Sequence, residues 1–336
     1  MPEHTAFVTG ATGLLGNNLV RELLTKGYRV KALVRSTAKA QQQLGGLADV
    51  EWVAGDMADV AQFAPAMAGC DVVFHTAAFF RDNYKGGNHW PTLEQINVRG
   101  TAQLIAQAYA HGVRRFVQTS SIAVLDGPPG SLLDETRVRA LKNADYYYRS
   151  KILADRQVDE FLAGHPSMFA CFVLPGWMWG PGDCGPTSAG QVARDTLAGK
   201  LPGLVPGSFS VVDARDVASI QIAAARQGRR GERYLAAGRH MTMAQLIPLI
   251  GRLGQVSTPT RRVPLPLLYI IAGVQECYAR LTRRPILLSL ATVRLLARES
   301  DRSRFDPSKT EQELQQGFRP IEETIGDTLR WLKLNR

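Results

Sequence analysis

The chain has 336 residues, of which 45% are hydrophobic and 21% are charged, and this composition excludes a disordered protein. Its length suits one large α/β unit or two domains. The net charge is +10, and residues 229–336 carry +9 of it through 19 Lys/Arg against 10 Asp/Glu. This basic third either attracts an anionic substrate or an acidic membrane surface or is an ordinary solvated surface. Because no nucleic-acid motif accompanies the charge, we expect no nucleic-acid partner.

Cysteines, histidines and apolar runs narrow the class further. The four cysteines form no CxxC pair and the six histidines have no metal-ligand spacing, so we expect a cytoplasmic protein with reduced thiols and no bound metal. Residues 5–9 already have the pattern of a core strand, so we expect no signal peptide. The apolar runs at 264–274 and 285–293 are each about half of the roughly 20 residues that a membrane-spanning helix needs. We therefore expect no membrane span and no membrane contact.

In chain order, the first half of the sequence alternates apolar, β-rich runs with helical stretches. The first predicted helix is 16–27, where apolar residues recur at helical spacing and Gly27 provides a C-terminal stop. The six predicted strands are 6–10, 29–35, 50–56, 71–78, 114–121 and 169–176. Their apolar residues lie on both faces, which indicates a parallel sheet covered by helices on each side. The pattern predicts an α/β fold with a doubly wound parallel (Rossmann) sheet.

The regular alternation ends after Gly176. Residues 177–208 are rich in glycine and proline, 210–225 has the pattern of a strand that enters a helix, and the chain from 231 onward is mostly helical. We therefore predict a Rossmann domain formed by 1–176 and 209–230. A smaller, discontinuous and mostly helical substrate domain is predicted from 177–208 and 231–336.

A glycine-rich turn, TGATGLLG at 9–16, follows the first predicted strand and opens the first helix. Gly10, Gly13 and Gly16 suit a tight turn, a close backbone approach to a pyrophosphate and close packing of the helix on the strand. Thr12, Leu14 and Leu15 also lie in this turn, and the start of the helix offers backbone N–H groups and the positive end of its dipole to a phosphate. The turn predicts a dinucleotide site.

The end of the second predicted strand indicates which dinucleotide binds. NAD-binding proteins of this fold place an acidic residue there for the ribose 2′-hydroxyl. Between residues 17 and 48 the only acid is Glu22, which lies inside the first helix, whereas the strand ends at Arg35 and Lys39 follows one helical turn later. A guanidinium binds a 2′-phosphate in a bidentate manner. We therefore predict NADP(H), the alternative being that Arg35 is a surface residue on a loop.

Three consecutive tyrosines stand in the segment ADYYYRSK at 144–151, which has helical periodicity. Residues four apart share a helix face, so Lys151 pairs with Tyr147 and with neither of its neighbours. A nearby ammonium is expected to lower the pKa of a phenol from about 10 toward the range useful for acid/base catalysis. The alternative is an aromatic cluster that fills a core.

A strand-end serine offers a second catalytic group. The predicted strand 114–121 ends in Ser120 and Ser121 at the carboxyl edge of the sheet, where doubly wound proteins bind their ligands. Ser121, with Ser120 as the neighbouring candidate, could donate a hydrogen bond to a substrate oxygen. A capping or turn serine is the alternative.

Taken together, these motifs resemble those of extended short-chain dehydrogenases/reductases, in particular the dihydroflavonol-reductase-like and 3β-hydroxysteroid-dehydrogenase-like branch. The motifs are TGATGLLG (9–16), GDM (55–57), HTAA (75–78), INVRGT (96–101), VQTSSIAV (117–124), YYRSK (147–151), LPGWMWGPGD (174–183) and VDARDVA (212–218). The resemblance covers nearly the whole chain. Extended members often dimerise through helices that flank the sheet, so it also points to a homodimer.

The resemblance implies roles for individual residues. Ser121 matches the catalytic serine, Tyr147 the acid/base, and Lys151 the residue that holds the nicotinamide ribose and tunes the tyrosine. The positions implied to contact the cofactor elsewhere are Asp56, Met57, Thr76, Ala77, Ala78, Asn97 and Pro175.

Aromatic residues near these motifs bear on the substrate. The sugar-nucleotide branch of the family has an arginine before the proline and an asparagine after the following glycine, where this chain has Leu174 and Trp177. Indole rings offer apolar stacking surface. The predicted substrate wall consists of Phe79, Phe80, Trp177 and Trp179, with core packing as the alternative for each.

The implied activity is reduction of a ketone or aldehyde, or oxidation of the alcohol, in a fairly apolar and possibly aromatic or alicyclic small molecule, with NADP(H) as the cofactor. The first alternative is a nucleotide-sugar epimerase or dehydratase with tightly bound NAD. The second alternative, from outside the enzymes, is a regulator that senses NADP without chemistry of its own.

Overall fold

The computed structural model describes residues 4–80, 88–282, 290, 293–294, 297, 299 and 301–335. A seven-stranded sheet in the order β3-β2-β1-β4-β5-β6-β9 forms its larger part, and all neighbouring strands in it are parallel. The strands are β1 (His4–Thr9), β2 (Tyr28–Val34), β3 (Val50–Ala54), β4 (Val72–His75), β5 (Arg115–Thr119), β6 (Phe169–Pro175) and β9 (Arg233–Ala236). The order reverses between β1 and β4, so the predicted doubly wound fold is confirmed.

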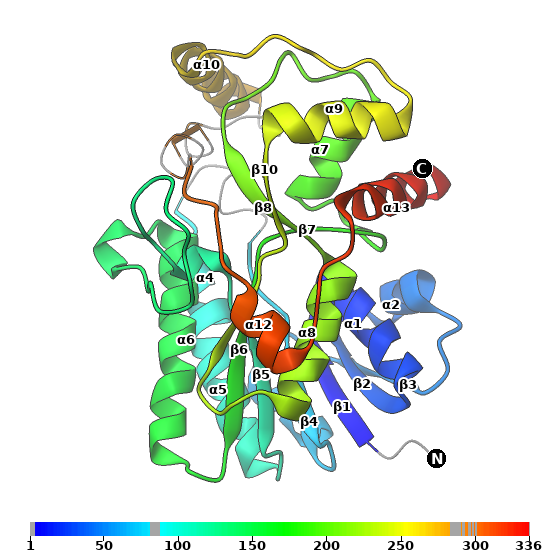
Figure 1. Cartoon of the computed structure of the whole chain (residues 1–336). Helices are drawn as coiled ribbons and strands as arrows, with labels where there is room; N and C mark the ends of the chain where they lie inside the picture. The colour runs from blue at the N-terminus through cyan, green and yellow to red at the C-terminus, as the bar shows by residue number, and fades with distance from the viewer. Residues whose placement is uncertain are drawn as a thin grey trace.

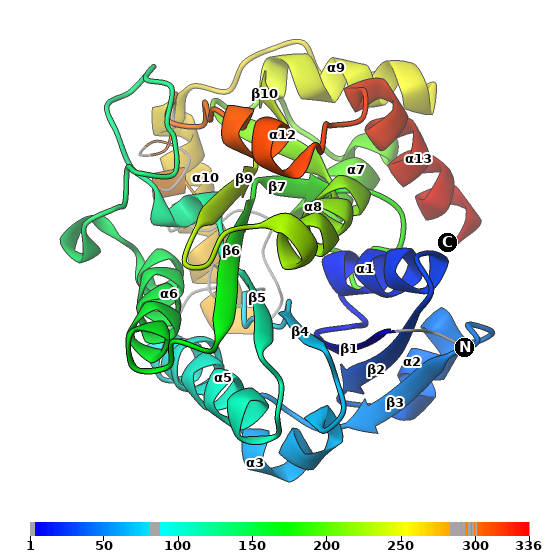
Figure 2. The same ribbon diagram turned by 60° about the horizontal axis from the view of Figure 1, so that its bottom comes forward.

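Two helical layers cover this sheet, and each has its own apolar core. The strands alternate between them, as β1 shows: Ala6 and Val8 belong to the core under α1 (Leu14–Thr25) and α8 (Ala214–Gln227), whereas Phe7 belongs to the opposite core. The opposite core lies under α5 (Gly100–Ala110) and α6 (Tyr146–Gly164). Figure 2 shows the sheet between these two layers. Burial on both faces explains the uninterrupted apolar runs in the sequence.

A second, smaller sheet lies beyond the main one, in the upper part of Figure 1. Its strands are β7 (Trp177–Trp179), β8 (Ser208–Asp213) and β10 (Arg239–Thr242), in the order β10-β8-β7. The helices of this region are α7 (Ser188–Leu197), α9 (Met243–Gly254), α10 (Leu265–Thr282) and α13 (Ile321–Leu334). A separate apolar core joins β7, β8 and β10 to α7, α9 and α13.

The strands of the second half differ from the predicted division. β8 belongs to the small sheet although 209–230 was predicted for the Rossmann domain, and β9 pairs with β6 in the main sheet although 231–336 was predicted for the substrate domain. α12 (Ser308–Leu314) also contacts α8 and β9 of the larger part. The chain therefore crosses between the two parts more often than the composition indicates, and the smaller part combines strands with helices.

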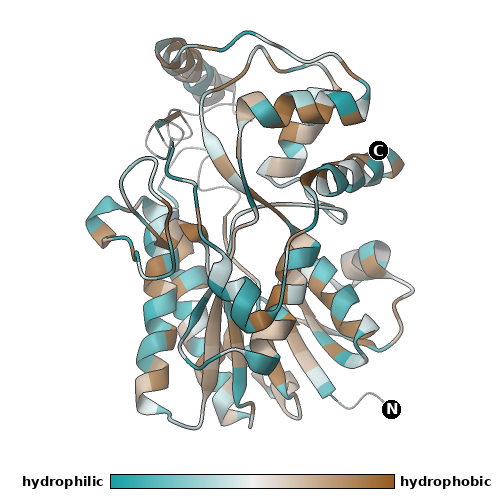
Figure 3. Ribbon diagram, in the orientation of Figure 1, coloured by the Kyte–Doolittle hydropathy of each residue, from teal (hydrophilic) through white to brown (hydrophobic). Residues whose placement is uncertain are grey.

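The remaining helical segments are short. They are α2 (Thr37–Leu44), α3 (Val60–Phe63), η1 (Ala64–Met67), α4 (Trp90–Leu93), η2 (Glu94–Arg99), η3 (Ile122–Val124) and η4 (Leu141–Asn143). Figure 3 shows apolar residues concentrated in the central strands and polar residues on the outer surfaces of the helices. None of the helices in the described ranges is long and apolar enough to cross a bilayer.

The packing of α1 against the sheet predicts that two leucine substitutions differ in their effect on the free energy of unfolding. Leu19 is fully buried in the core between α1 and α8, whereas Leu132 is 63% exposed. Leu19→Ala removes buried apolar surface and leaves a cavity, so the free energy of unfolding should fall by about 2–5 kcal/mol. Leu132→Ala is the matched control and should cost far less. Chemical denaturation of both variants measures the difference, and equal losses would contradict the described packing.

Candidate active site

The glycine turn between β1 and α1 is shaped for close approach of a ligand. Gly10 has φ +68°, and a Cβ atom there would lie 2.8 Å from the backbone nitrogen of Ala77. A Cβ at Gly16 would collide with the Gly10 carbonyl, which explains a glycine inside α1. At Gly13 a Cβ would lie 3.2 Å from that same carbonyl oxygen. The three glycines therefore maintain the tight turn for steric reasons that can be assigned one by one.

The start of α1 has the features of an anion site. Gly13 occupies the N-cap position, no side chain caps the helix, and the first turn contains no acidic residue. Leu14 and Leu15 are buried in the wall behind the turn, and Thr12 is half-buried. The first N–H groups and the helix dipole are thus available to a phosphate. The turn fits the pyrophosphate of a dinucleotide.

At the end of β2, Arg35 is exposed and has no ion-pair partner among the residues that the structure describes. Glu22, the only nearby acid in the sequence, lies in α1 and pairs with Lys26 at 3.2 Å. The strand end therefore presents a cation and no carboxylate. The side chain of Lys39, the second predicted cation, lies outside the described residues.

Asp56 and Met57 follow the end of β3. Asp56 accepts a hydrogen bond from the Ala58 backbone nitrogen at 2.9 Å, which closes a turn, and Met57 is buried. A Cβ at Gly100 would come within 2.9 Å of the Met57 carbonyl oxygen. This turn thus lies beside the ends of β2 and β3, where the resemblance places the adenine.

A buried network of hydrogen bonds fixes the turn after β4. Thr76 donates through its hydroxyl to the Thr9 carbonyl at 2.6 Å, and the Thr9 hydroxyl accepts from the backbone nitrogens of Thr76 and Ala77 at 3.1 Å each. Ala78 is exposed at the end of this turn. The turn is therefore tied directly to the end of β1.

His75 extends this network, a role that the motif HTAA did not reveal. Its Nδ1 lies 2.7 Å from the Thr9 hydroxyl and its Nε2 lies 3.0 Å from the Thr101 hydroxyl. Because Thr101 donates its proton to the Asn97 carbonyl at 2.6 Å, Nε2 must carry the hydrogen and Nδ1 must accept. Burial, and secondarily the Lys151 ammonium, lower the pKa of His75 to about 3. His75 is thus a neutral structural residue.

Asn97 joins the segment that follows β4 to α6. It lies in the π-helical segment η2, and its Oδ1 accepts from the Phe79 backbone nitrogen at 2.7 Å. Its Nδ2 donates to the Phe79 carbonyl at 3.1 Å and to the Ser150 hydroxyl at 3.0 Å. Ser150 in turn donates to the Tyr147 carbonyl at 2.7 Å. A π-helical irregularity at a functional position is common.

The three tyrosines at the start of α6 have three different environments. Tyr147 lies beside Ser121, whose hydroxyl lowers the pKa of the phenol, and its ring meets that of Phe80 edge-on with centroids 4.7 Å apart. Tyr148 packs under the Arg139 guanidinium at 4.8 Å. Tyr146 is 48% exposed and lies beside Trp90. Of the three tyrosines, only Tyr147 lies next to Ser121 at the end of β5.

The two serines after β5 are also distinguished by their partners. Ser121 caps the short helix η3 by accepting from the Ala123 backbone nitrogen at 3.1 Å, and its hydroxyl also lowers the pKa of Tyr147. Ser120 is buried and donates to Asp155 at 2.5 Å. The structure therefore brings Ser121, and not Ser120, to the phenol. The capping role and the contact with Tyr147 occur together.

Lys151 is buried one turn after Tyr147, and its Nζ donates to the Thr119 carbonyl at 2.9 Å. Burial lowers its pKa to about 8, and Asp155 opposes this shift. The pKa of Tyr147 is raised, chiefly by burial, and the hydrogen bond to Ser121 lowers it only in part. The prediction that Lys151 lowers this pKa is therefore wrong for the structure described here, because burial among aromatic rings outweighs any attraction of the phenolate to the ammonium.

The residues of the predicted substrate wall lie in different surroundings. Phe80 contacts Tyr147, and Trp177 is half-buried with its indole N–H donated to Ser188 at 2.9 Å. Trp179 is fully buried in the core of the small sheet, so its assignment to an accessible wall is wrong. Its ring lies edge-on to that of Trp177, with centroids 5.0 Å apart. Pro175, which the resemblance places against the cofactor, is buried at the end of β6.

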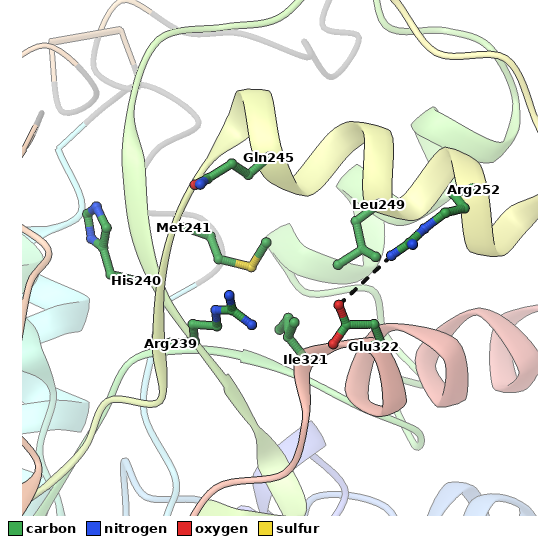
Figure 4. Close-up of a pocket in the computed structure, with 8 residues that line it drawn as sticks. All are labelled: Arg239, His240, Met241, Gln245, Leu249, Arg252, Ile321 and Glu322. Carbon is green, nitrogen blue, oxygen red and sulfur yellow. Dashed lines mark ion pairs between the residues drawn. The ribbon is translucent and has the colours of Figure 1, made fainter.

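A hollow of about 260 Å³ lies elsewhere, between β10, α9 and the start of α13 (Figure 4). Its polar groups are largely paired: Arg252 lies 3.9 Å from Glu322, and His240 lies 3.1 Å from the Ser303 carbonyl. In the described ranges no three His, Cys, Asp or Glu side chains gather as metal ligands.

Comparisons with known proteins agree with this geometry. The sequence model of the NAD dependent epimerase/dehydratase family matches residues 6–237. Sterol demethylase protein B of Methylococcus capsulatus is 33% identical over 332 residues, which cover 98% of each chain. A Synechocystis protein provisionally named dihydroflavonol 4-reductase is 31% identical over 336 residues, covering 97% of this chain and 94% of that protein. The crystal structure of gox2253 superposes with a TM-score of 0.82 at 27% identity and covers 99% of this chain and 98% of that one.

The collision at Gly16 generates a prediction about dinucleotide binding. Gly16→Ala places a methyl group against the Gly10 carbonyl, which must shift the turn, so NADPH binding should be lost or weakened at least tenfold. Gly326→Ala is the matched control, since Gly326 also lies in a helix but a Cβ there would meet nothing within 4 Å. NADPH fluorescence titration measures both. Unimpaired binding by Gly16→Ala would contradict the assignment of the turn.

Proposed function

We propose that this chain, which belongs to the NAD dependent epimerase/dehydratase family of extended short-chain dehydrogenases/reductases, is an oxidoreductase that uses NADP(H) to reduce an apolar ketone or aldehyde. The single observation that carries the proposal is the placement of Tyr147 beside the Ser121 hydroxyl, with the buried Lys151 ammonium one turn away. Family membership supports a nicotinamide-dependent oxidoreductase. The choice of NADP(H), the direction and the substrate are our inferences.

The residues that would hold the dinucleotide are distributed along the carboxyl ends of the strands. The glycine turn and the start of α1 suit the pyrophosphate, the Asp56–Met57 turn suits the adenine, and Lys151 suits the nicotinamide ribose. When bound, the nicotinamide supplies or accepts the hydride.

The chain's own contribution to reduction is a proton and a hydrogen bond. Tyr147 keeps its proton throughout the neutral range because burial raises its pKa, so its hydroxyl can donate that proton to a developing alkoxide. Ser121 can stabilise the same oxygen by hydrogen bonding. Lys151 is a cation at neutral pH, since its pKa is about 8. These states favour the direction of carbonyl reduction.

Apolar rings support a substrate with little polar surface. Phe80 lies against Tyr147, and Trp177 presents a half-buried indole from β7. The names of the two relatives refer to a sterol and a dihydroflavonol, which are both polycyclic. We therefore infer an aromatic or alicyclic carbonyl compound. A screen of such ketones with NADPH, read by loss of reduced-cofactor absorbance, tests this directly, and oxidation of NADPH by none of them would count against the proposal.

The first rival is a nucleotide-sugar epimerase or dehydratase, whose family this chain shares. Such an enzyme would retain NAD through turnover, so purified protein with stoichiometric NAD and no ketone reduction would favour it. The second rival, a regulator that senses NADP, has no use for a Tyr147–Ser121 pair. Leu174 and Trp177, which replace the arginine and asparagine of the sugar-nucleotide pattern, favour the reductase over the first rival.

The tyrosine row allows a sharp test with internal controls. Tyr147→Phe removes the donated proton and should lower kcat by about 10²–10⁴-fold with little effect on NADPH affinity. Tyr148→Phe and Tyr146→Phe remove the same atom from neighbouring residues that lie at Arg139 and at the surface, and they should retain most activity. Steady-state kinetics on a ketone from the screen provides the readout. A Tyr147→Phe variant with unchanged kcat would remove this residue from its proposed role.

Arg35 provides a test of cofactor preference. A guanidinium bound to the 2′-phosphate contributes charged hydrogen bonds, so Arg35→Ala should raise the Kd for NADPH by about tenfold to a hundredfold and leave the Kd for NADH nearly unchanged. Arg29→Ala is the control, because Arg29 is an exposed arginine at the opposite end of β2. Equal effects of Arg35→Ala on both cofactors would contradict the NADP(H) proposal.

A further inference from the structure

Asp155 is a buried carboxylate that lies one helical turn beyond Lys151 on the inner face of α6. Its Oδ2 accepts a hydrogen bond from Ser120 at 2.5 Å. Its Oδ1 is buried as well, and no hydrogen-bond partner for it is found among the described residues. A buried carboxylate with an uncommitted oxygen is expensive for a folded protein, so its retention calls for a role beyond packing.

The surroundings of Asp155 connect it to both catalytic segments. Ser120, its hydrogen-bond donor, directly precedes Ser121, which lies beside Tyr147. Lys151 lies on the same face of α6 one turn earlier and donates to Thr119, the residue before Ser120. Asp155 is therefore attached to the serine turn through a hydrogen bond and acts on the ammonium through its charge.

We propose that Asp155 is a positioning residue for the Tyr147–Lys151 pair, which keeps Lys151 a cation inside the protein and thereby maintains its hold on the ribose of a nicotinamide cofactor. This inference rests on the proposed cofactor binding and adds to it a carboxylate that does not itself touch the reacting atoms. No salt bridge within 4.0 Å joins Asp155 to Lys151 among the described residues, so Asp155 acts on the ammonium through its charge at longer range.

The charged and titratable groups around this pair are few. Lys151 faces the neutral His75 from β4 and the Thr119 carbonyl from β5. Asp155 faces Ser120 from β5 and Arg233 from β9, and Arg233 is itself engaged by Asp159 at 2.8 Å. Burial raises the pKa of Asp155 to about 6, and the pKa of Lys151 is about 8, so both groups are charged at neutral pH. Among the described carboxylates, Asp155 is the one that acts on Lys151.

Asp155→Asn tests the charge while keeping the shape and an acceptor for Ser120. Loss of the negative charge lowers the pKa of Lys151. The pH above which NADPH binding weakens should therefore be about one pH unit lower than in the natural chain. NADPH fluorescence titrations between pH 6.5 and 10 measure this without a substrate. Lys151→Met should abolish this pH dependence, which identifies the titrating group.

Two controls separate charge from structure. Asp159→Asn removes a carboxylate one turn further along the same helix, 41% exposed and paired with Arg233, and should leave the pH dependence unchanged. Ser120→Ala removes a hydrogen bond that lowers the pKa of Asp155 but leaves a carboxylate that is charged at the basic end of the titration, so its midpoint should shift less than that of Asp155→Asn. A midpoint shift in Ser120→Ala equal to that in Asp155→Asn would overturn the proposal in favour of a structural role.

A readout without cofactor distinguishes this inference from the proposed function. NMR titration of chains labelled with ¹⁵N at the lysine Nζ, assigned through Lys151→Met, reports the charge of Lys151 directly. A lower midpoint in Asp155→Asn supports the proposal, and an unchanged midpoint overturns it. If the natural chain bound neither NADPH nor NADH, the proposed function would fail, whereas the NMR result would still decide whether Asp155 holds the charge.

Discussion

The bond from the buried Lys151 ammonium to the Thr119 carbonyl is the contact on which the candidate site depends. An ammonium in an apolar interior is costly without partners, so α6 is constrained to the one height against β5 at which this bond forms. At that height Tyr147, one turn earlier, reaches Ser121, two residues beyond Thr119. A single polar contact thus sets the register between the proton donor and its hydrogen-bond partner.

A second set of contacts links this pair to the glycine turn across the sheet. Thr9 at the end of β1 bonds His75, His75 bonds Thr101, and Thr101 bonds the Asn97 carbonyl, while the Asn97 side chain reaches Ser150 in α6. Every link is a hydrogen bond between neutral groups, because burial and the Lys151 ammonium keep His75 uncharged. The scaffold therefore stays the same near neutral pH while Lys151 titrates.

Features that follow from a repeating local pattern can be predicted from this sequence, whereas features that depend on tertiary packing cannot. Apolar runs on both strand faces predict the parallel sheet, and helical spacing identifies Tyr147 as the partner of Lys151, since both follow from local periodicity. The return of β9 to the main sheet and the burial of Trp179 depend on which distant strands pair, so local pattern could not supply them. The role of His75 is hidden for the same reason, because its partners lie 66 and 26 residues away.

Two opposing effects act on the pKa of Tyr147, and the Y-x-x-x-K spacing alone does not distinguish them. A nearby ammonium is expected to lower the pKa of a phenol. The ring of Tyr147, however, packs against those of Phe80 and Tyr148, and desolvation raises its pKa by more than other groups lower it. The field of Lys151 is felt instead at His75, which it helps to keep neutral. A phenol that holds its proton is ready to protonate an alkoxide, whereas alcohol oxidation would first require its removal. Desolvation raises the pKa of Tyr147 more than hydrogen bonding lowers it, so the phenol keeps its proton at neutral pH, which supports the proposed direction of reduction.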